Sequence, residues 1–501
     1  MRKIPATMVT QHPDHVSKPY FLDQAFISTR DESEECYRSF ADIGATEYKW
    51  DWEGKLVDES VLERLFSDYY SYFKKQQLGR DRFLTFRLPN PNAETEFRIG
   101  RAFMSIAAAN SMAKKVKLNS PALFEVILPM TESADAMMAI PEAYAQMHNL
   151  THEIYRFDTS IITNLEVIPL FEQVETISHA DDIIREYVEK YKKKFGTTQT
   201  YIRPYMARSD PAINSGMIPT VLAVKIALSR FKALEKELGI TMYPMLGAAA
   251  LPFRGGLTPH TVKDFVKEFS GIRTTTIQSA FRFDYDLDDV KEAIQMLEAL
   301  LPKGKAKTVS TEDEKALRQL ISTFEKEYKK SVEPLAPIIN DVAKLLPKRR
   351  ERVQHVGLFG YSRGVGKVKL PRAIGFTAAM YSLGLPPEII GTGRGLREAK
   401  KKGLLPILEQ YYLNIRKDLL RAGRYVNKEL LAKRAKESAT WADLQKDVQA
   451  IEEYLGKPLE PKTGEELEHV VLTKVIANRL SDNLSVSEFI EEAARMRKSM
   501  G

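Results

Sequence analysis

The sequence has 501 residues, of which 44% are hydrophobic and 28% charged, and its formal net charge is +7. This composition is typical of globular proteins, and no stretch approaches the roughly 20 consecutive apolar residues of a membrane-spanning helix. The single cysteine, Cys36, excludes an internal disulfide framework and a cysteine-based zinc cluster. The first residues lack the apolar core of a secretion signal, so we expect a cytoplasmic protein with no membrane association.

The excess of basic residues is compatible with binding either nucleic acid or small anionic substrates. The basic runs at residues 190–195, 347–352 and 399–403 adjoin segments with helical periodicity. Such placement is typical of solvated helix ends rather than of a track along a phosphate backbone. We therefore expect small-molecule substrates and no nucleic-acid partner.

Residues 1–45 are predicted to form an arm that precedes the regular structure. It contains the stretch TMVTQHPDHV at residues 7–16, in which His12 stands directly before a proline. A residue before proline has restricted backbone freedom. This restriction suits a side chain that is held in place for a task, although a histidine in a simple surface arm would look the same.

Eight short apolar runs follow the arm, and a longer segment with helical periodicity follows most of them. We interpret these runs as β-strands: Thr46–Trp52, Phe83–Leu88, Leu123–Met130, Leu165–Phe171, Tyr201–Met206, Thr241–Leu246, Thr274–Phe283 and His355–Phe359. Strands that alternate with helices predict a parallel sheet. Eight such units predict an α/β fold with a closed (β/α)8 barrel of the TIM type.

The remaining segments are predicted to be helical additions to this barrel. Residues 46–370 contain the predicted barrel, residues 286–350 a helical insert, and residues 371–501 an almost wholly helical region. We expect a single domain over residues 1–501. An open doubly wound sheet is the alternative, but no glycine-rich nucleotide loop follows the first predicted strand.

Charged or polar side chains follow several predicted strands at the point where each strand ends. They are Arg87, Glu172, Arg208, Asp210, Arg254, Gln278, Arg282 and Arg363, with Lys367 and Arg372 close behind the last. Chemistry in a barrel of this kind occurs at the carboxyl ends of the strands. Carboxylates are the side-chain ligands that Mg²⁺ prefers, and arginines bind phosphate and carboxylate groups in a bidentate manner. Any one of these residues could be only a helix cap or an ion-pair partner, but together they indicate a metal site with an anionic substrate.

Six motifs occur in an order and combination that resembles the phosphoenolpyruvate carboxylase family, in its short archaeal-type form. They are TQHPD, VIPLFE, ARSDPAINSG, LPFRGG, IRTTTIQSAFRF and GYSRGVGK, and the resemblance extends over essentially the whole chain. It implies a TIM-type barrel with many extra helices, a homotetramer, an allosteric enzyme, and a Mg²⁺ or Mn²⁺ ion. The implied reaction joins bicarbonate to phosphoenolpyruvate and gives oxaloacetate and phosphate.

The resemblance also implies roles for individual residues. Glu172 and Asp210 match the family's metal ligands, and His12, Arg254 and Arg363 match catalytic residues. Arg372 matches an arginine that binds phosphate, and we expect further substrate contacts from Arg87, Arg208, Gln278 and Lys367. The arm would bring His12 over the barrel mouth, where it would help to decompose carboxyphosphate.

The chain departs from the longer members of that family at three positions. Ile213 stands in place of a lysine, Pro252 in place of a histidine, and His260 in place of a second arginine. Gly501 resembles the family's C-terminal glycine, which helps to close the active site, but the preceding Asn and Thr are absent. The effector sites of the longer members do not carry over.

Two other functions are compatible with parts of the pattern. Another metal-dependent barrel lyase or mutase that acts on phosphoenolpyruvate or a keto acid would share the carboxylate pair and the arginines, and incorporation of labelled bicarbonate would distinguish it. A basic nucleic-acid-binding protein would bind tightly in a salt-dependent manner, but it would leave the strand-end carboxylates unexplained.

Overall fold

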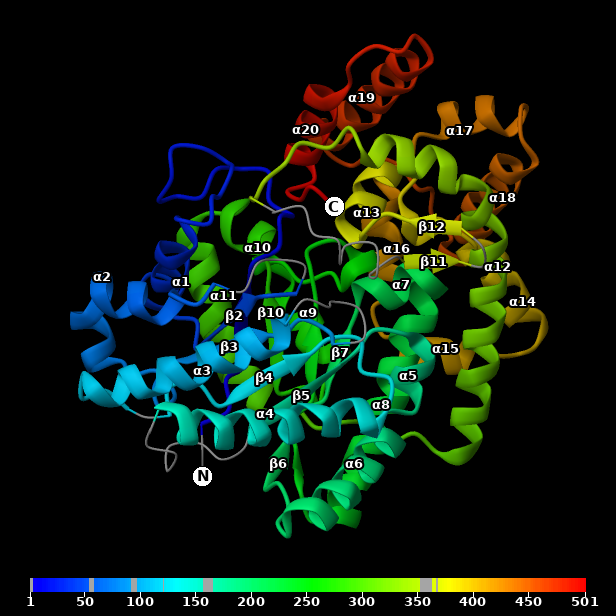
Figure 1. Ribbon diagram of the computed structural model, residues 1–501. Helices are drawn as coiled ribbons and strands as arrows, with labels where there is room; N and C mark the ends of the chain where they lie inside the picture. Colours follow the sequence, from blue (N-terminus) through cyan, green and yellow to red (C-terminus); the bar gives the residue numbers. More distant parts are fainter. Residues whose placement is uncertain are drawn as a thin grey trace.

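A computed structural model of the protein describes residues 3–53, 58–91, 97–119, 121–155, 165–351, 363–365 and 368–501. Eight parallel strands close into a barrel in the order β1-β10-β9-β7-β5-β4-β3-β2 (Figure 1). They are β1 (Thr7–Thr10), β2 (Glu47–Asp51), β3 (Phe83–Arg87), β4 (Glu125–Leu128), β5 (Glu166–Phe171), β7 (Tyr205–Ala207), β9 (Met245–Gly247) and β10 (Thr274–Ile277). The predicted (β/α)8 barrel is confirmed.

Strand β1 closes the barrel and lies in the segment that was predicted to be an arm. Its residue Met8 is opposite Glu47 on β2 and Thr276 on β10. The prediction of residues 1–45 as an arm before the regular structure is therefore wrong for Thr7–Thr10, and it is also wrong for Glu32–Ala41, which form a helix. The predicted eighth strand, His355–Phe359, lies outside the described residues, and the barrel closes without it.

Prolines divide two of the predicted strands. Pro204 and Pro244 have no amide hydrogen for the hydrogen-bond ladder and so interrupt it. The residues before them form a separate parallel pair, β6 (Tyr201–Ile202) and β8 (Thr241–Met242), and the residues after them enter the barrel as β7 and β9. A further antiparallel pair, β11 (Arg363–Val365) and β12 (Val368–Leu370), lies outside the barrel.

Helices surround the barrel and make up most of the chain after β10 (Figure 1). Up to β10 they are α1 (Glu32–Ala41), α2 (Val61–Lys75), α3 (Arg98–Lys115), α4 (Ala134–Tyr155), α5 (Val174–Ser178), α6 (Ala180–Phe195), α7 (Ser209–Ser215), α8 (Met217–Leu238), η1 (Pro252–Arg254), η2 (Pro259–Thr261) and α9 (Val262–Glu268). After β10 they are α10 (Ser279–Phe283), α11 (Leu287–Leu300), η3 (Leu301–Lys303), α12 (Thr311–Ala343), α13 (Ala373–Ser382), η5 (Pro387–Ile389), α14 (Thr392–Lys401), α15 (Leu405–Tyr411), α16 (Ile415–Gly423), α17 (Lys428–Ala435), α18 (Ala439–Leu455), α19 (Gly464–Ser481) and α20 (Ser487–Met496). No helix in the described ranges is long and apolar enough to cross a membrane.

The C-terminal helices lie toward one end of the barrel. Figure 1 shows α19 and α20 at this end, with the last residue of the chain beside α13. The first residues lie at the opposite end of the barrel in the same view. The end of the chain is therefore close to the carboxyl ends of the strands, where chemistry is expected.

Strand β2 shows how the sequence separates the barrel wall from its interior. Tyr48 and Trp50 belong to the main hydrophobic core. Glu47, Lys49 and Asp51 alternate with them and are also buried. Because successive side chains of a strand point to opposite faces, these three charged side chains face the interior of the barrel.

The barrel interior is filled in layers from its amino end. There the guanidinium of Arg203 pairs with Glu47 at 2.6 Å and with Glu125 at 2.7 Å, and all three side chains are inaccessible or nearly so. An apolar layer made of Met8, Ile127, Ile168, Leu170, Tyr205 and Met245 packs inside the barrel. This filling leaves the carboxyl ends of the strands as the place for a site.

Candidate active site

Two cavities adjoin the carboxyl ends of the strands, and Asp210 lines both of them. The basic cavity has a volume of about 560 Å³, and its charged lining includes Arg87, Arg254, Lys348, Arg349, Arg350 and Arg372 together with Asp51, Glu53, Asp210 and Glu351. The acidic cavity has a volume of about 520 Å³, and its charged lining includes Glu172, Glu175, Asp210 and Glu325 together with Arg318 and Lys329. Asp210 thus stands between a region rich in carboxylates and a region rich in guanidinium groups.

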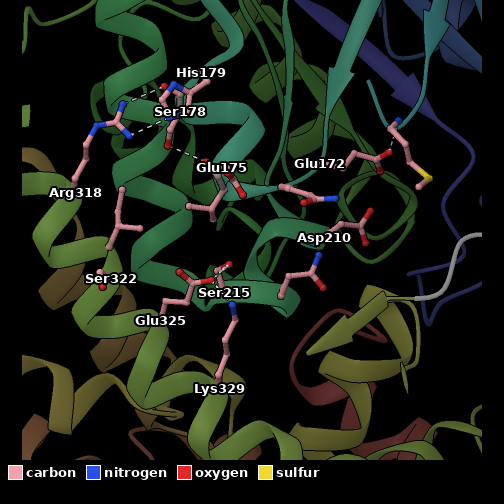
Figure 2. A pocket seen from close by; sticks show the side chains of 15 residues that line it. Glu172, Glu175, Ser178, His179, Asp210, Ser215, Arg318, Ser322, Glu325 and Lys329 are labelled. Atoms are coloured by element: carbon pink, nitrogen blue, oxygen red, sulfur yellow. Dashed lines mark hydrogen bonds and ion pairs between the residues drawn. The ribbon is translucent and has the colours of Figure 1, made fainter. Parts of the chain in front are cut away.

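Glu172 and Asp210 come from neighbouring strands. Glu172 directly follows β5, Asp210 lies in the first turn of α7 just after β7, and these two strands pair in the barrel. Figure 2 shows both side chains on the same side of the acidic cavity. The buried carboxylate of Glu172 is oriented by the backbone N–H of Met130, which donates a hydrogen bond to Oε2 at 2.8 Å.

The chemistry of this pair fits a hard divalent cation. Within the described ranges, no group of three or more His, Cys, Asp or Glu side chains is arranged to hold a metal ion. Mg²⁺ does not need such a group, because it keeps several water ligands and is often bound by one or two carboxylates plus substrate oxygens. Glu172 and Asp210 are a donor set of this kind.

A glycine-rich turn after β9 presents Arg254. The arginine ends η1, and Gly255 and Gly256 follow with φ angles of 121° and 72°. A Cβ atom on Gly255 would lie 2.8 Å from the Cβ of Ala248, so this position needs glycine for both its backbone conformation and its packing. The turn holds Arg254 against the barrel mouth.

Oxygen atoms of three residues accept hydrogen bonds from Arg254, which is only 1% exposed. Its guanidinium donates to Ser209 Oγ at 3.0 Å, to Gln278 Oε1 at 2.7 Å and to a backbone oxygen of Gly501. The carboxylate of Asp14 is 3.7 Å away. Burial lowers the pKa of Arg254 below its ordinary value, and the nearby Asp14 and Asp210 oppose this effect. The guanidinium remains charged, and an anion in the basic cavity would add to the compensation that Asp14 and Asp210 provide.

His12 lines the basic cavity directly after β1. Its Nδ1 lies 2.6 Å from the hydroxyl oxygen of Thr10. Burial, followed by the positive charge of Lys49, lowers the pKa of His12 well below its ordinary value. The imidazole is therefore neutral near pH 7 and can accept a proton.

Arg87 also lines the basic cavity, but its charge is already paired. It forms close ion pairs with Asp51 and Glu53. Burial alone would lower its pKa, but these two carboxylates hold the pKa well above the ordinary value. Arg87 is thus less available to an anionic substrate than Arg254.

Lys49 is a charged residue of the site that the sequence analysis missed. It is 1% exposed on β2, with its Nζ 3.7 Å from Asp51 Oδ1. Burial and the neighbouring Arg87 lower the pKa of Lys49 to about 8. Asp51 and Glu53 were missed as well, although the alternation of polar and aromatic residues from 47 to 52 is a pattern that could have revealed an inward-facing charged set.

Three of the predicted strand-end residues are oriented toward protein groups and line neither cavity. Gln278 accepts the hydrogen bond from Arg254. Arg208 is buried beneath the η1 turn, where it donates to the carbonyl oxygen of Pro252 at 3.4 Å. Arg282 pairs with Glu35 at 2.7 Å. These positions indicate support of the site rather than direct contact with a substrate.

The last three predicted residues follow the helical insert. Arg372 lines the basic cavity immediately before α13. Arg363 belongs to β11, which packs near α7, but its side chain is outside what the structure describes. Lys367 lies outside the described residues.

Comparison with known proteins shows the family of the chain. The family model described as phosphoenolpyruvate carboxylase matches residues 4–501. The phosphoenolpyruvate carboxylase of Leuconostoc mesenteroides is 35% identical over 100% of this chain and 99% of its own length. That of Methanothermobacter thermautotrophicus is 38% identical over 100% of both chains. Among solved structures, a citrate lyase from Burkholderia xenovorans covers 82% of this chain and 97% of its own at 11% identity, with a TM-score of 0.34, which is too distant to bear on the site. With a family match over nearly its whole length, the chain belongs to the phosphoenolpyruvate carboxylase family.

Proposed function

We propose that this protein carboxylates phosphoenolpyruvate with bicarbonate and releases oxaloacetate and phosphate. The observation that carries the proposal is the position of Asp210, which joins a carboxylate pair to a cavity lined by guanidinium groups. A phosphorylated carboxylic acid needs both features, because its anionic groups bind to arginines and its enol oxygen needs a further positive charge. Membership of the family supports the same reaction.

Glu172 and Asp210 are the residues that would hold a Mg²⁺ or Mn²⁺ ion. Such an ion, when bound, supplies positive charge to the enol oxygen as negative charge develops there. The Met130 N–H helps by fixing one oxygen of Glu172, so that the carboxylate is oriented before the ion arrives.

Arg254 and Arg372 are placed to bind the phosphate and carboxylate groups of the substrate in the basic cavity. A guanidinium presents two parallel N–H donors to such groups. Arg254 is already oriented by Ser209 and Gln278, so little reorganisation is needed when the reaction begins.

In the first step, an oxygen of bicarbonate attacks phosphorus while the bond from phosphorus to the enol oxygen breaks. The products are carboxyphosphate and the enolate of pyruvate. Negative charge on the transferring phosphoryl group faces the fixed guanidinium of Arg254, and stabilisation of developing charge by oriented groups is usually the largest contribution to such rates.

In the second step, His12 removes the proton from the carboxyl group of carboxyphosphate. The bond between carbon and the bridging oxygen then breaks, giving carbon dioxide and phosphate, which can take the proton back from His12. The enolate carbon attacks carbon dioxide and forms the new carbon–carbon bond of oxaloacetate. For this role Nε2 of His12 must be unprotonated, which holds when Nδ1–H donates to Thr10 Oγ1.

The cavity must also exclude water, because a proton from water would convert the enolate to pyruvate. Apolar side chains of Phe26, Ile374 and Met500 line the basic cavity beside the charged groups. They reduce the space open to water around a bound substrate.

The reaction is tested with ¹⁴C-bicarbonate and phosphoenolpyruvate in the presence of Mg²⁺. We expect labelled oxaloacetate, no product after removal of the metal by a chelator, and a loss of kcat of about a thousandfold in Asp210→Asn with an unchanged melting temperature. The matched control is Asp264→Asn, which removes a surface partner of Lys417. Conversion of phosphoenolpyruvate without bicarbonate would indicate a lyase or mutase instead.

Family membership further supports a homotetramer, allosteric regulation and a cytoplasmic location. Light scattering during size-exclusion chromatography would then give about four times the chain mass of 57.0 kDa.

A further inference from the structure

The residues after α20 lie between two buried arginines. The guanidinium of Arg254 donates to a backbone oxygen of Gly501, and that of Arg497 donates to the carbonyl oxygen of Met500 at 2.6 Å. The backbone N–H of Met500 donates to the carbonyl oxygen of Asp14 at 2.7 Å. We call residues 498–501 the tail segment; it joins α20 both to the site and to the stretch that carries His12.

The tail segment packs at backbone distance against α13. A Cβ atom on Gly501 would lie 2.8 Å from the amide nitrogen of Ala378 and would also collide with the carbonyl oxygen of Ile374. These are helix backbone atoms, which cannot move without disturbing α13. The position of Gly501, and with it one contact of Arg254, is therefore defined closely.

Arg497 holds the tail segment through its hydrogen bond to Met500, and its guanidinium is buried among neutral groups. It is 5% exposed, its Nη1 is 3.1 Å from His469 Nε2, and its Cζ lies 5.4 Å from the centre of the Tyr381 ring. Among the described residues, no side-chain carboxylate forms an ion pair with it. Burial lowers the pKa of Arg497 to about 10. A buried cation without a carboxylate is costly, so stability alone is a poor explanation for this arrangement.

His469 on α19 acts as a neutral acceptor for Arg497. A guanidinium can only donate hydrogen bonds, so Nε2 of His469 must be unprotonated. Burial, together with the charge of Arg497, lowers the pKa of His469 well below its ordinary value. The ring of Tyr425, 4.7 Å away between centroids, packs against the imidazole and orients it.

The same network reaches Arg254 from its backbone side. Glu388 Oε1 accepts a hydrogen bond from the hydroxyl of Tyr381 at 3.0 Å. It also accepts one from the backbone N–H of Phe253, the residue before Arg254, at 2.8 Å. Arg254 is thus held at its guanidinium by the tail segment and at its turn by Glu388, and Tyr381 contacts both branches.

We propose that Arg497 and His469 are positioning residues for the carboxylation reaction: they hold the tail segment so that Gly501 orients the guanidinium of Arg254 toward the substrate. Neither residue lines the basic cavity, and each acts through Arg254. The proposal rests on the proposed function, since the orientation of Arg254 matters for phosphoryl transfer.

The kinetic test compares conservative and disruptive variants of each residue. Arg497→Met and His469→Phe remove the donor and the acceptor, whereas Arg497→Lys keeps the charge and His469→Gln keeps an acceptor oxygen. We expect kcat to fall by about a hundredfold in the disruptive pair, with more phosphoenolpyruvate lost as pyruvate, and to recover in large part in the conservative pair. The matched control is Arg394→Met, a partly buried arginine that pairs with Asp447 on α18, which should lower the melting temperature without changing kcat.

Gly501→Ala provides an independent way to displace the tail segment. If both changes act through it, the double variant Arg497→Met/Gly501→Ala should be little worse than either single variant, because coupled residues are not additive. Fully additive losses, or an unchanged kcat in Arg497→Met, would overturn the proposal.

Hydrogen–deuterium exchange gives a readout that does not depend on activity. We expect faster exchange in Arg497→Met and His469→Phe for peptides that cover residues 497–501 and residues 250–257, and wild-type exchange in Arg394→Met. Unchanged exchange at both peptides would contradict the proposal. A wild-type protein that makes no oxaloacetate, but whose variants show the faster exchange, would disprove the proposed function while leaving the restraint on Arg254 intact.

Discussion

The two ends of the barrel each bury an arginine, and the two arginines differ in what compensates their charge. At the amino end, Arg203 has two carboxylates within 2.7 Å, and Glu47 and Glu125 hold its pKa above the ordinary value despite burial. At the carboxyl end, Arg254 donates hydrogen bonds to Ser209 and Gln278, the carboxylate of Asp14 is 3.7 Å away, and burial lowers the pKa of the arginine. The arginine at the amino end therefore belongs to a structural ion pair, whereas the arginine at the carboxyl end carries a charge that can bind an anionic ligand.

Burial does not distinguish a structural arginine from a functional one, because both arginines are inaccessible to solvent. The groups that compensate the charge distinguish them better. A buried ion pair is complete without a ligand. A buried cation with neutral partners is stabilised electrostatically when an anion enters the cavity beside it. Arg87 is intermediate between the two arginines: it lines the basic cavity, but Asp51 and Glu53 already form ion pairs with it.

The largest effect should come from breaking the amino-end cluster. In Arg203→Met, Glu47 and Glu125 would remain buried without their partner, so we expect the free energy of unfolding to fall by about 3–5 kcal/mol in denaturant titrations. The KM for phosphoenolpyruvate should stay unchanged in the folded fraction. A loss of less than about 1 kcal/mol would show that the cluster does not depend on the arginine.

For Arg254→Gln we expect the opposite result, which is a large loss of activity with a smaller loss of stability. The substitution removes a charge aimed at the substrate, so kcat/KM should fall by about 100- to 1000-fold in steady-state assays. The buried carboxylate of Asp14, 3.7 Å away, would lose its ion-pair partner, so we expect some loss of stability, but a smaller one than in Arg203→Met. A large loss of stability with near-normal kinetics would place Arg254 in the same class as Arg203.

The barrel itself could be predicted because its strands and helices repeat as alternating apolar runs and helical periods. Strand β1 could not be predicted, because the four residues Thr-Met-Val-Thr are too few to show a hydrophobic periodicity. They form a strand by pairing with β2 and β10. The division at Pro204 and Pro244 was visible in the sequence, but which side of each proline enters the barrel depends on packing.

The candidate site was predictable where a side chain follows a strand end, as for Glu172, Asp210 and Arg254. It was not predictable where distant segments meet. The family resemblance placed Gly501 at the active site, but nothing in the sequence near Arg254 indicates that its guanidinium contacts Gly501, 247 residues away. The position of Arg208 beneath the η1 turn likewise depends on how the loop after β9 folds over α7.

His12→Asn tests whether the residue after β1 takes part in the chemistry. We expect the rate of oxaloacetate formation to fall by about a hundredfold, while cleavage of phosphoenolpyruvate to pyruvate continues, since phosphoryl transfer does not require His12. Parallel assays of pyruvate and oxaloacetate measure the ratio. Full carboxylation by the variant would show that the segment after β1 is only structural.

The smallest effect is expected for Lys49→Met. Lys49 is a buried charged residue near the basic cavity but does not line it. Lys49 lowers the pKa of His12, so its removal should raise that pKa and move the acid limb of the kcat/KM profile to higher pH. At neutral pH the loss should be no more than about twofold, because burial still keeps His12 mostly unprotonated there. Lys225→Met is the matched control, because Lys225 is also a buried lysine with a lowered pKa but pairs with Glu268 away from His12.

Stability provides the second measurement for the same variant. The pKa of Lys49 is about 8 in the folded protein and 10.5 ordinarily, so the unfolded chain binds more protons than the folded chain between these values. The free energy of unfolding of the wild type should therefore rise with pH across this window through Lys49, and the rise should be smaller in Lys49→Met. A variant that loses this rise but keeps the acid limb of the wild type would show that the charge of Lys49 does not act on His12.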